Sequence, residues 1–215
     1  MAKVQLLALI MVIAVVSFLG FSVENIWLSV TKGYMDNRNM CFPFLLGYGV
    51  AVAAIYLLFG TPQCLVICGK KIFAGSQAGR KAFYILLVML CVSIGEIALG
   101  TFVEKTCHFY WWDYSRLPMH ITRYTTIPTS LGFSLMIAIF MEHIFDPLYR
   151  YFQTWNYEVL RLTASVLMAV MIWDFAYNAY KMYRDKMMIR RWRIDMTGTR
   201  GYRLLHTNLA QWLEH

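Results

Sequence analysis

Residues 86–100 read LLVMLCVSIGEIALG, an almost unbroken apolar run that nevertheless carries Glu96. The run continues to Glu104 and then leads into the segment Trp111-Trp112-Asp113-Tyr114-Ser115. A helix needs about 20 apolar residues to cross the hydrocarbon core of a bilayer, and this stretch with its flanks supplies them. A carboxylate inside such a helix is costly, so it indicates a functional site with a partner elsewhere in the chain.

The composition is that of an integral membrane protein. Hydrophobic residues make up 59% of the chain and charged residues only 15%, and the mean hydropathy is +0.49. A soluble domain does not need this much apolar surface for its core. The apolar stretches predict an all-α polytopic bundle of about five transmembrane helices, at 5–29, 42–60, 83–106, 127–145 and 159–180. No room is expected between them for a soluble nucleotide-binding or catalytic domain.

Short loops and a basic tail account for the remaining residues. We expect a transmembrane domain at 1–185, a basic cytoplasmic tail at 186–212 and a remnant of an affinity tag at 213–215. Lys and Arg residues near the span ends are more numerous on the membrane side that carries the tail. This bias predicts a multi-pass cell-membrane protein with a cytoplasmic C terminus. The density of arginines at 190–193 also predicts binding to anionic lipid headgroups.

The order of the spans brings acidic residues toward one membrane face. Glu24 and Glu104 lie near the ends of the first and third predicted spans, and Asp174 lies in the second half of the fifth. The two loops on that face carry polar residues that we expect to converge with these acids: Asn37, Arg38, Asp113, Tyr114 and Ser115. We expect Asp113 to pair with Arg38 or Arg116, because a partly buried carboxylate is tolerated mainly when it is paired.

A polar stripe runs along one face of the third predicted span. Ser93, Glu96, Gly100 and Glu104 follow helical steps of three or four residues. Glu96 and Glu104 are about 12 Å apart along the axis at 1.5 Å per residue. This spacing suits a carboxylate relay or a tall cavity, with Gly100 allowing close approach between the two acids. The alternative is that each acid is neutral or hydrogen-bonded and only fixes helix packing.

Three motifs carry a family resemblance over residues of about 18–150. They are a Gly-x-x-x-Glu step at Gly20 and Glu24, an Asn-Arg loop followed by Pro and Gly-x-Gly, and a Glu-x-x-x-Gly-x-x-x-Glu span leading into Trp-Asp-Tyr-Ser. The second and third motifs match Asn37, Arg38, Pro43, Gly47, Gly49, Glu96, Gly100, Glu104, Trp112, Asp113, Tyr114, Ser115 and Pro118. The chain thereby resembles the CmpB-type family of ABC-transporter membrane proteins. That resemblance implies a permease that binds or moves a small or lipid-like substrate, with a separate ATPase subunit.

Three classes of function stay open on the sequence. The first is the transporter that the resemblance implies. The second is an intramembrane enzyme, such as a lipid-modifying enzyme or cyclase, in which Glu or Asp performs acid–base chemistry on a lipid or isoprenoid. The third is a membrane scaffold or accessory protein whose acids only hold helices together.

The candidate site follows from the acids and from the loops near them. The catalytic or substrate-binding candidates are Glu24, Glu96, Glu104 and Asp113, and the further substrate-binding candidates are Asn37, Arg38, Trp112, Tyr114, Ser115 and Asp174. No cofactor and no metal site is expected, because the five cysteines are scattered without a paired two-residue spacing. The expected partners are membrane lipids, the substrate and the ATPase subunit, and no nucleic acid.

Overall fold

Long apolar helices form the framework of the protein in a computed structural model that describes residues 2–67, 69–71 and 75–196. The helices are α1 (Ala2–Thr31), α2 (Leu46–Phe59), α3 (Gln77–Cys107), α4 (Ile127–Phe140), α5 (Asp146–Gln153) and α6 (Tyr157–Asp185). A π-helical turn, Met141–Phe145, joins α4 to α5, so that Ile127–Gln153 forms one kinked helix. The predicted all-α fold is therefore confirmed. Residues 197–212 of the predicted basic tail and the predicted tag remnant at 213–215 lie outside the described residues.

Four helices in the described ranges are long and apolar enough to cross a membrane: α1, α3, the kinked α4–α5 helix and α6. The second predicted span, 42–60, is shorter than expected. Helix α2 has 14 residues and rises only about 21 Å, less than the roughly 30 Å of a hydrocarbon core. It begins late because Pro43 cannot donate a backbone hydrogen bond and because Asp174 accepts the backbone N–H groups of Cys41 and Phe42.

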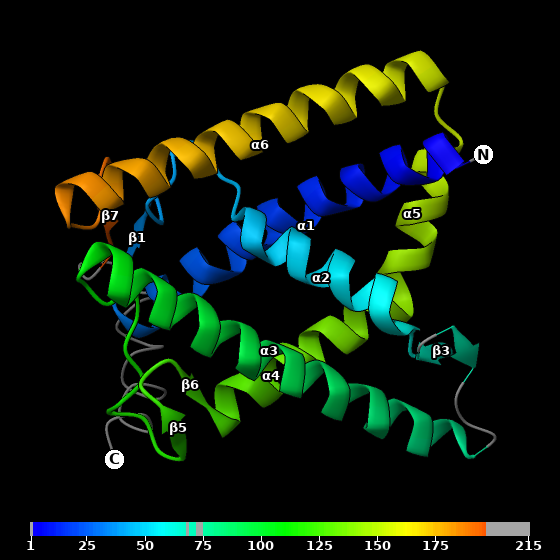
Figure 1. Ribbon diagram of the computed structural model, residues 1–215, viewed down its shortest axis with the longest axis horizontal. Helices are drawn as coiled ribbons and strands as arrows, with labels where there is room; N and C mark the ends of the chain where they lie inside the picture. The colour runs from blue at the N-terminus through cyan, green and yellow to red at the C-terminus, as the bar shows by residue number, and fades with distance from the viewer. Residues whose placement is uncertain (1, 68, 72–74, 197–215) are drawn as a thin grey trace.

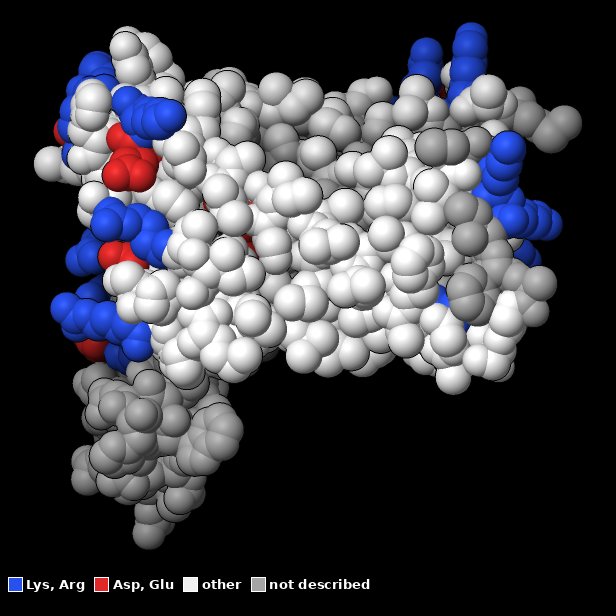
Figure 2. Space-filling view, turned by 60° about the horizontal axis from the view of Figure 1, so that its bottom comes forward, with Lys and Arg blue, Asp and Glu red and all other residues white. Residues whose placement is uncertain are grey.

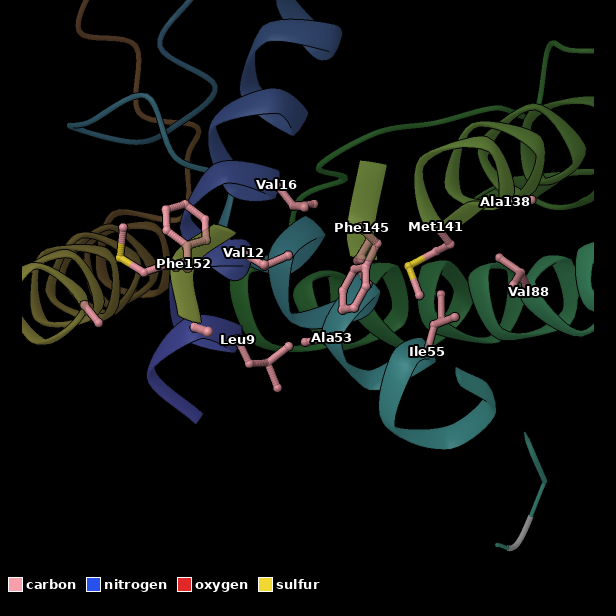
Figure 3. Packing of buried hydrophobic residues seen from close by; sticks show 14 of the residues in the cluster. Leu9, Val12, Val16, Ala53, Ile55, Val88, Ala138, Met141, Phe145 and Phe152 are labelled. Carbon is pink, nitrogen blue, oxygen red and sulfur yellow. The ribbon is translucent and has the colours of Figure 1, made fainter. Parts of the chain in front are cut away.

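The helices run back and forth along the long axis of the molecule (Figure 1). Helices α1, α3 and α6 run in one direction, and α2 and the kinked α4–α5 helix return. Helix α1 packs against α2, α5 and α6, whereas α3 packs mainly against α4. Figure 3 shows Val12, Ile55, Val88, Met141 and Phe145 meeting in the apolar core. Leu160 and Ala164 of α6 belong to the same core.

Short strands secure the connections at the two ends of the bundle. At one end, β1 (Tyr34–Asp36) pairs antiparallel with β7 (Arg193–Asp195), and β5 (His120–Thr122) pairs with β6 (Thr125–Thr126). At the other end, β2 (Gly60–Thr61), β3 (Cys64–Ile67) and β4 (Lys70–Lys71) form a small antiparallel sheet. We call the first end the loop end; it holds residues 32–45 and 108–126 and the segment 186–196, which we call the strap.

Charge is distributed as a membrane requires. Figure 2 shows Lys and Arg gathered at the two ends of the molecule, with a wide band between them in which the visible surface has almost no charged residues. Large apolar side chains such as Leu57, Ile94 and Leu162 are exposed to the surroundings, as expected where lipid rather than water is the solvent. With its four long spans, the protein is a multi-pass membrane protein.

Candidate functional site

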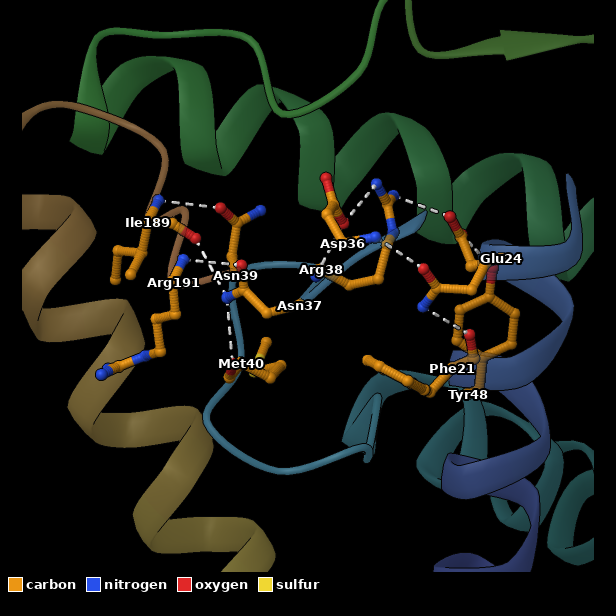
Figure 4. Close-up of polar contacts among 11 residues, drawn as sticks. Phe21, Glu24, Asp36, Asn37, Arg38, Asn39, Met40, Tyr48, Ile189 and Arg191 are labelled. Carbon is orange, nitrogen blue, oxygen red and sulfur yellow. Dashed lines mark hydrogen bonds and ion pairs between the residues drawn. The ribbon is translucent and has the colours of Figure 1, made fainter. Parts of the chain in front are cut away.

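The first polar contact at the loop end joins α1 to α2. The ring of Tyr48 lies against Gly20, so close that a Cβ placed on Gly20 would be 2.6 Å from the Tyr48 Cγ atom. The Tyr48 hydroxyl donates to Oε1 of Glu24 over 2.5 Å. The other carboxylate oxygen of Glu24 accepts a hydrogen bond from Arg38, with 2.7 Å between Nη2 and Oε2. Glu24 is thus held by a hydroxyl on one side and by a guanidinium on the other (Figure 4).

The loop that carries Arg38 is fixed by its own hydrogen bonds. Arg38 has a left-handed backbone with φ of 47°. Its backbone N–H donates to Oδ1 of Asp36 over 2.8 Å, and the backbone N–H of Asp36 donates to Oδ1 of Asn25 over 2.8 Å. The Nε atom of Arg38 is buried and has no hydrogen-bond partner in the described structure. Buried donors almost always have an acceptor, so this Nε is exceptional among the buried side-chain atoms of the described residues.

A second contact of the same design joins α3 to the segment before α4. The ring of Tyr124 occupies the space above Gly100, where a Cβ would collide with it. The Tyr124 hydroxyl donates to the carboxylate of Glu104, one helical turn beyond the glycine. Burial, reinforced by the hydrogen bond to Glu104, raises the pKa of Tyr124 to about 12, so its hydroxyl stays a donor at neutral pH.

Glu96 lies deeper along α3 among hydroxyl groups. Its Oε2 accepts from the Thr125 hydroxyl at 2.6 Å and lies 3.5 Å from the Ser130 hydroxyl. Ser93 continues the line, because its hydroxyl donates to that of Ser130 over 3.0 Å. The stripe predicted on α3 therefore faces hydroxyls of β6 and α4 rather than another acid.

Tyr114 lies between the two regions. Burial is the main cause of its raised pKa, the carboxylates of Glu96 and Glu24 add to the rise, and Arg38 opposes it. One phenol thus interacts electrostatically with groups from α1, α3 and the 32–45 loop. The backbone N–H of Tyr114 donates to the carbonyl of Arg123 over 2.7 Å, and Trp112 Nε1 donates to the carbonyl of Tyr124 over 2.8 Å. The Trp-Asp-Tyr-Ser segment is thereby folded back onto the residues that precede α4.

Asp113 and Ser115 lie apart from this cluster. Both are exposed, and the Ser115 backbone N–H donates to Oδ1 of Asp113 over 2.8 Å. That hydrogen bond is the main cause of the lowered pKa of Asp113, with smaller contributions from the charges of Arg123 and Arg116. The expectation that Asp113 pairs with Arg38 or Arg116 is wrong among the described residues. Arg38 pairs with Glu24 and lies 3.8 Å from a carboxylate oxygen of Asp36 instead.

Asn37 and Asp174 are fully engaged with the protein itself. Asp174 is 1% exposed and accepts from the backbone N–H groups of Cys41 and Phe42 and from the Asn178 amide. Asn37 is 2% exposed; its amide donates to the carbonyls of Met40 and Ile189 and its oxygen accepts from the Arg191 backbone N–H. We infer that both residues hold the 32–45 loop and the strap in place rather than contacting a substrate.

The sequence reasoning missed the residues that complete the two contacts: Tyr48, Tyr124, Thr125, Ser130 and Asp36. Tyr48 had a signal, because it stands between Gly47 and Gly49 of the Gly-x-Gly step. For Tyr124 and Thr125, the sequence indicated only that they lie in a predicted loop on the same membrane face as the acids. Hydroxyl donors do not alter hydrophobic periodicity, so the pattern that located the acids could not locate their partners.

An open depression lies at the surface beside Glu104. It has a volume of about 560 Å³ and is lined by Glu104, Lys105, His108 and Tyr110. His108 ends α3 in a left-handed conformation with φ of 61°, and its backbone N–H donates to the carbonyl of Glu104. The carboxylate of Glu104 therefore lies at the boundary between the bundle and its surroundings.

These features define a polytopic α-helical membrane protein with carboxylates placed at and below one end of its spans. The chain belongs to the family described as "Putative ABC-transporter type IV", whose model matches residues 11–179. The resemblance seen in the motifs is thereby confirmed and covers more of the chain than the motifs did. The comparisons with curated proteins and with solved structures give no match. Family and fold together make this a transporter-like membrane protein.

Proposed function

We propose that the protein is the membrane-embedded component of an ABC-type transporter, with the ATPase supplied by another chain. The observation that carries the proposal is the line of polar side chains down α3 inside a membrane span. The line runs from Glu104 and Tyr124 to Glu96 and Thr125 and ends at Ser130 and Ser93. From Glu104 to Ser93 it extends about 17 Å along the helix axis.

Polar groups at this depth are costly unless they serve a path or a binding site. Carboxylates and hydroxyls exchange hydrogen bonds readily, so a polar solute or a water file can replace one protein partner by another along the line. The phenol of Tyr114 interacts electrostatically with Glu96 of this line and with Glu24 and Arg38. We propose that Glu24, Arg38 and Tyr114 contact the substrate together with Glu96 and Glu104.

The charges of the cluster favour a particular substrate chemistry. Two glutamates, Glu24 and Glu96, stand with Asp36 against the guanidinium of Arg38. An excess of acceptors in a poorly solvated site favours a cationic group or a group rich in hydrogen-bond donors. We propose a small or lipid-like substrate with such a group, and with an acceptor atom that reaches the unpartnered Nε of Arg38.

The scaffold alternative also has an observation in its favour. Each of the three glutamates accepts a hydrogen bond from a protein hydroxyl, as residues with a packing role would. The two alternatives differ in whether the line along α3 is reached by water. A path for a polar substrate admits water in at least one state of the protein, and a packed helix contact does not.

Thiol accessibility tests this difference without knowledge of the substrate. In a variant whose native cysteines are replaced by alanine, Ser93→Cys is expected to react with a cationic, membrane-impermeant methanethiosulfonate reagent in native membrane vesicles. The matched control is Ile94→Cys, because Ile94 is the next residue of α3 and is 66% exposed toward the lipid side. A thiol in hydrocarbon does not ionise, so Ser93→Cys should react faster than Ile94→Cys by a factor on the order of ten.

Comparing reagents of opposite charge adds a second test to the same experiment. The excess of acids predicts that the cationic reagent reacts with Ser93→Cys faster than an anionic reagent of similar size. Using right-side-out and inside-out vesicles also tests the proposed cytoplasmic orientation of the loop end. Equal, slow reaction of Ser93→Cys and Ile94→Cys from both sides would show that the line is a dry packing contact and would refute the path.

A further inference from the structure

Helix α3 presents an apolar stripe to its surroundings. Leu86, Leu90, Ile94 and Phe102 are exposed by 51%, 52%, 66% and 63% of their surfaces. Each step of four residues turns by about 40° around the helix axis, so these side chains and the exposed Ala98 form a band that winds along the exposed side of α3. Of the four candidate spans, α3 is the least covered by the rest of the protein. The stripe is therefore a surface along which hydrocarbon chains can lie.

The stripe ends at the depression beside Glu104. Lys105, about one helical turn after Phe102, lines the depression together with Glu104, His108 and Tyr110. The guanidinium of Arg123 lies 4.2 Å from the centre of the Tyr110 ring and so adds a cation at the rim. Counted with Arg116, which like Arg123 acts on Asp113, the three cations Lys105, Arg116 and Arg123 outnumber the two carboxylates Glu104 and Asp113. The local charge is positive even with His108 neutral.

We propose that this surface binds a phospholipid with an anionic headgroup, its acyl chains along the α3 stripe and its phosphodiester at Lys105 and His108. The positive local charge favours a headgroup of net negative charge. The carboxylate of Glu104 accepts hydrogen bonds, so a headgroup hydroxyl, as in phosphatidylglycerol, has an acceptor beside the phosphate site. The volume of about 560 Å³ is within the usual range of pockets for small ligands.

This lipid site does not depend on the proposed transport function. Lys105 and His108 take no part in the line of hydroxyls and carboxylates along the interior face of α3, and their variants leave that line intact. The two proposals can therefore fail separately.

Competition between lipids in the purified full chain tests the proposal. The protein in detergent micelles is exposed to equal amounts of phosphatidylglycerol and phosphatidylcholine with the same acyl chains, and retained lipids are counted by native mass spectrometry. Phosphatidylglycerol adducts should predominate in the parent. In Lys105→Gln with His108→Gln the predominance should fall about fivefold, the effect of removing one cation near a lipid surface. Lys105→Arg should retain it.

The matched control is Arg190→Gln, which removes one exposed cation at the same end outside the depression. It should leave the preference for phosphatidylglycerol unchanged. An equal loss in Arg190→Gln would show a general attraction to the basic end face and overturn the site. Equal retention of both lipids by the parent would do the same, and so would displacement of phosphatidylglycerol by an equal concentration of water-soluble glycerol phosphate.

Discussion

The contact of Tyr48 with α1 and the contact of Tyr124 with α3 use the same three parts. In each, a tyrosine ring lies on a helix glycine and its hydroxyl donates to a glutamate four residues later, Glu24 after Gly20 and Glu104 after Gly100. The surroundings differ. Glu24 is closed in by Arg38, whose loop is held by the strap, whereas Glu104 borders an open depression. The comparison teaches that one local design serves as a closed, charge-neutralised contact in one place and as a boundary contact in the other.

Removal of the guanidinium should have the largest effect on the closed region. Arg38→Gln leaves Glu24 and Asp36 near each other without a cation, and the free energy of unfolding should fall by about 2–4 kcal/mol, less than for a fully buried pair because both side chains are partly exposed. Unfolding by sodium dodecyl sulfate in mixed micelles measures it. Lys105→Gln, at the open region, is the control and should change little. Partial recovery in Arg38→Gln with Glu24→Gln is expected, and an unchanged stability of Arg38→Gln would remove the ion pair from this account.

Adding one methyl group to each glycine tests whether the two contacts share a design. Gly20→Ala and Gly100→Ala should each cost about 1–3 kcal/mol, because the nearest atoms are ring atoms close to the tyrosine backbone and cannot swing aside. Gly95→Ala is the control on α3, since a Cβ there meets nothing within 4 Å. It should be neutral or slightly stabilising. Melting temperatures in detergent suffice, and a tolerated Gly100→Ala would set the two contacts apart.

Removing the tyrosine hydroxyls should separate the closed region from the open one. Tyr48→Phe leaves a carboxylate oxygen of the largely buried Glu24 without its donor, so we expect a loss of about 1–2 kcal/mol. Tyr124→Phe should cost less than about 1 kcal/mol, because water in the depression can replace the lost donor. The two variants are compared by the same micelle titration. A larger loss for Tyr124→Phe would reverse the assignment of closed and open.

The sequence predicted the framework and the acids but not their partners. Apolar length located all five helices, and chain order placed Glu24, Glu104 and Asp174 toward the loop end. The shorter α2 was missed because Phe42 to Leu45 are as apolar as a helix start, while the hydrogen bond that holds Phe42 outside the helix comes from Asp174 far along the chain. The sequence predicted that Asp113 pairs with Arg38 or Arg116, because these residues lie in loops on one face. The real partner of Arg38, Glu24, comes closer because α1 ends directly before the Arg38 loop.

The strap has a consequence for how the protein is made. Asn37 receives its partners Ile189 and Arg191 only after about 150 further residues have been synthesised, and β1 finds β7 later still. During insertion into the membrane the Arg38 loop must therefore wait, with the first helix already in place, until the last span has been threaded. The strap thereby makes the closed region depend on the whole bundle, because that region reaches its folded form only when the helices before the strap are in place.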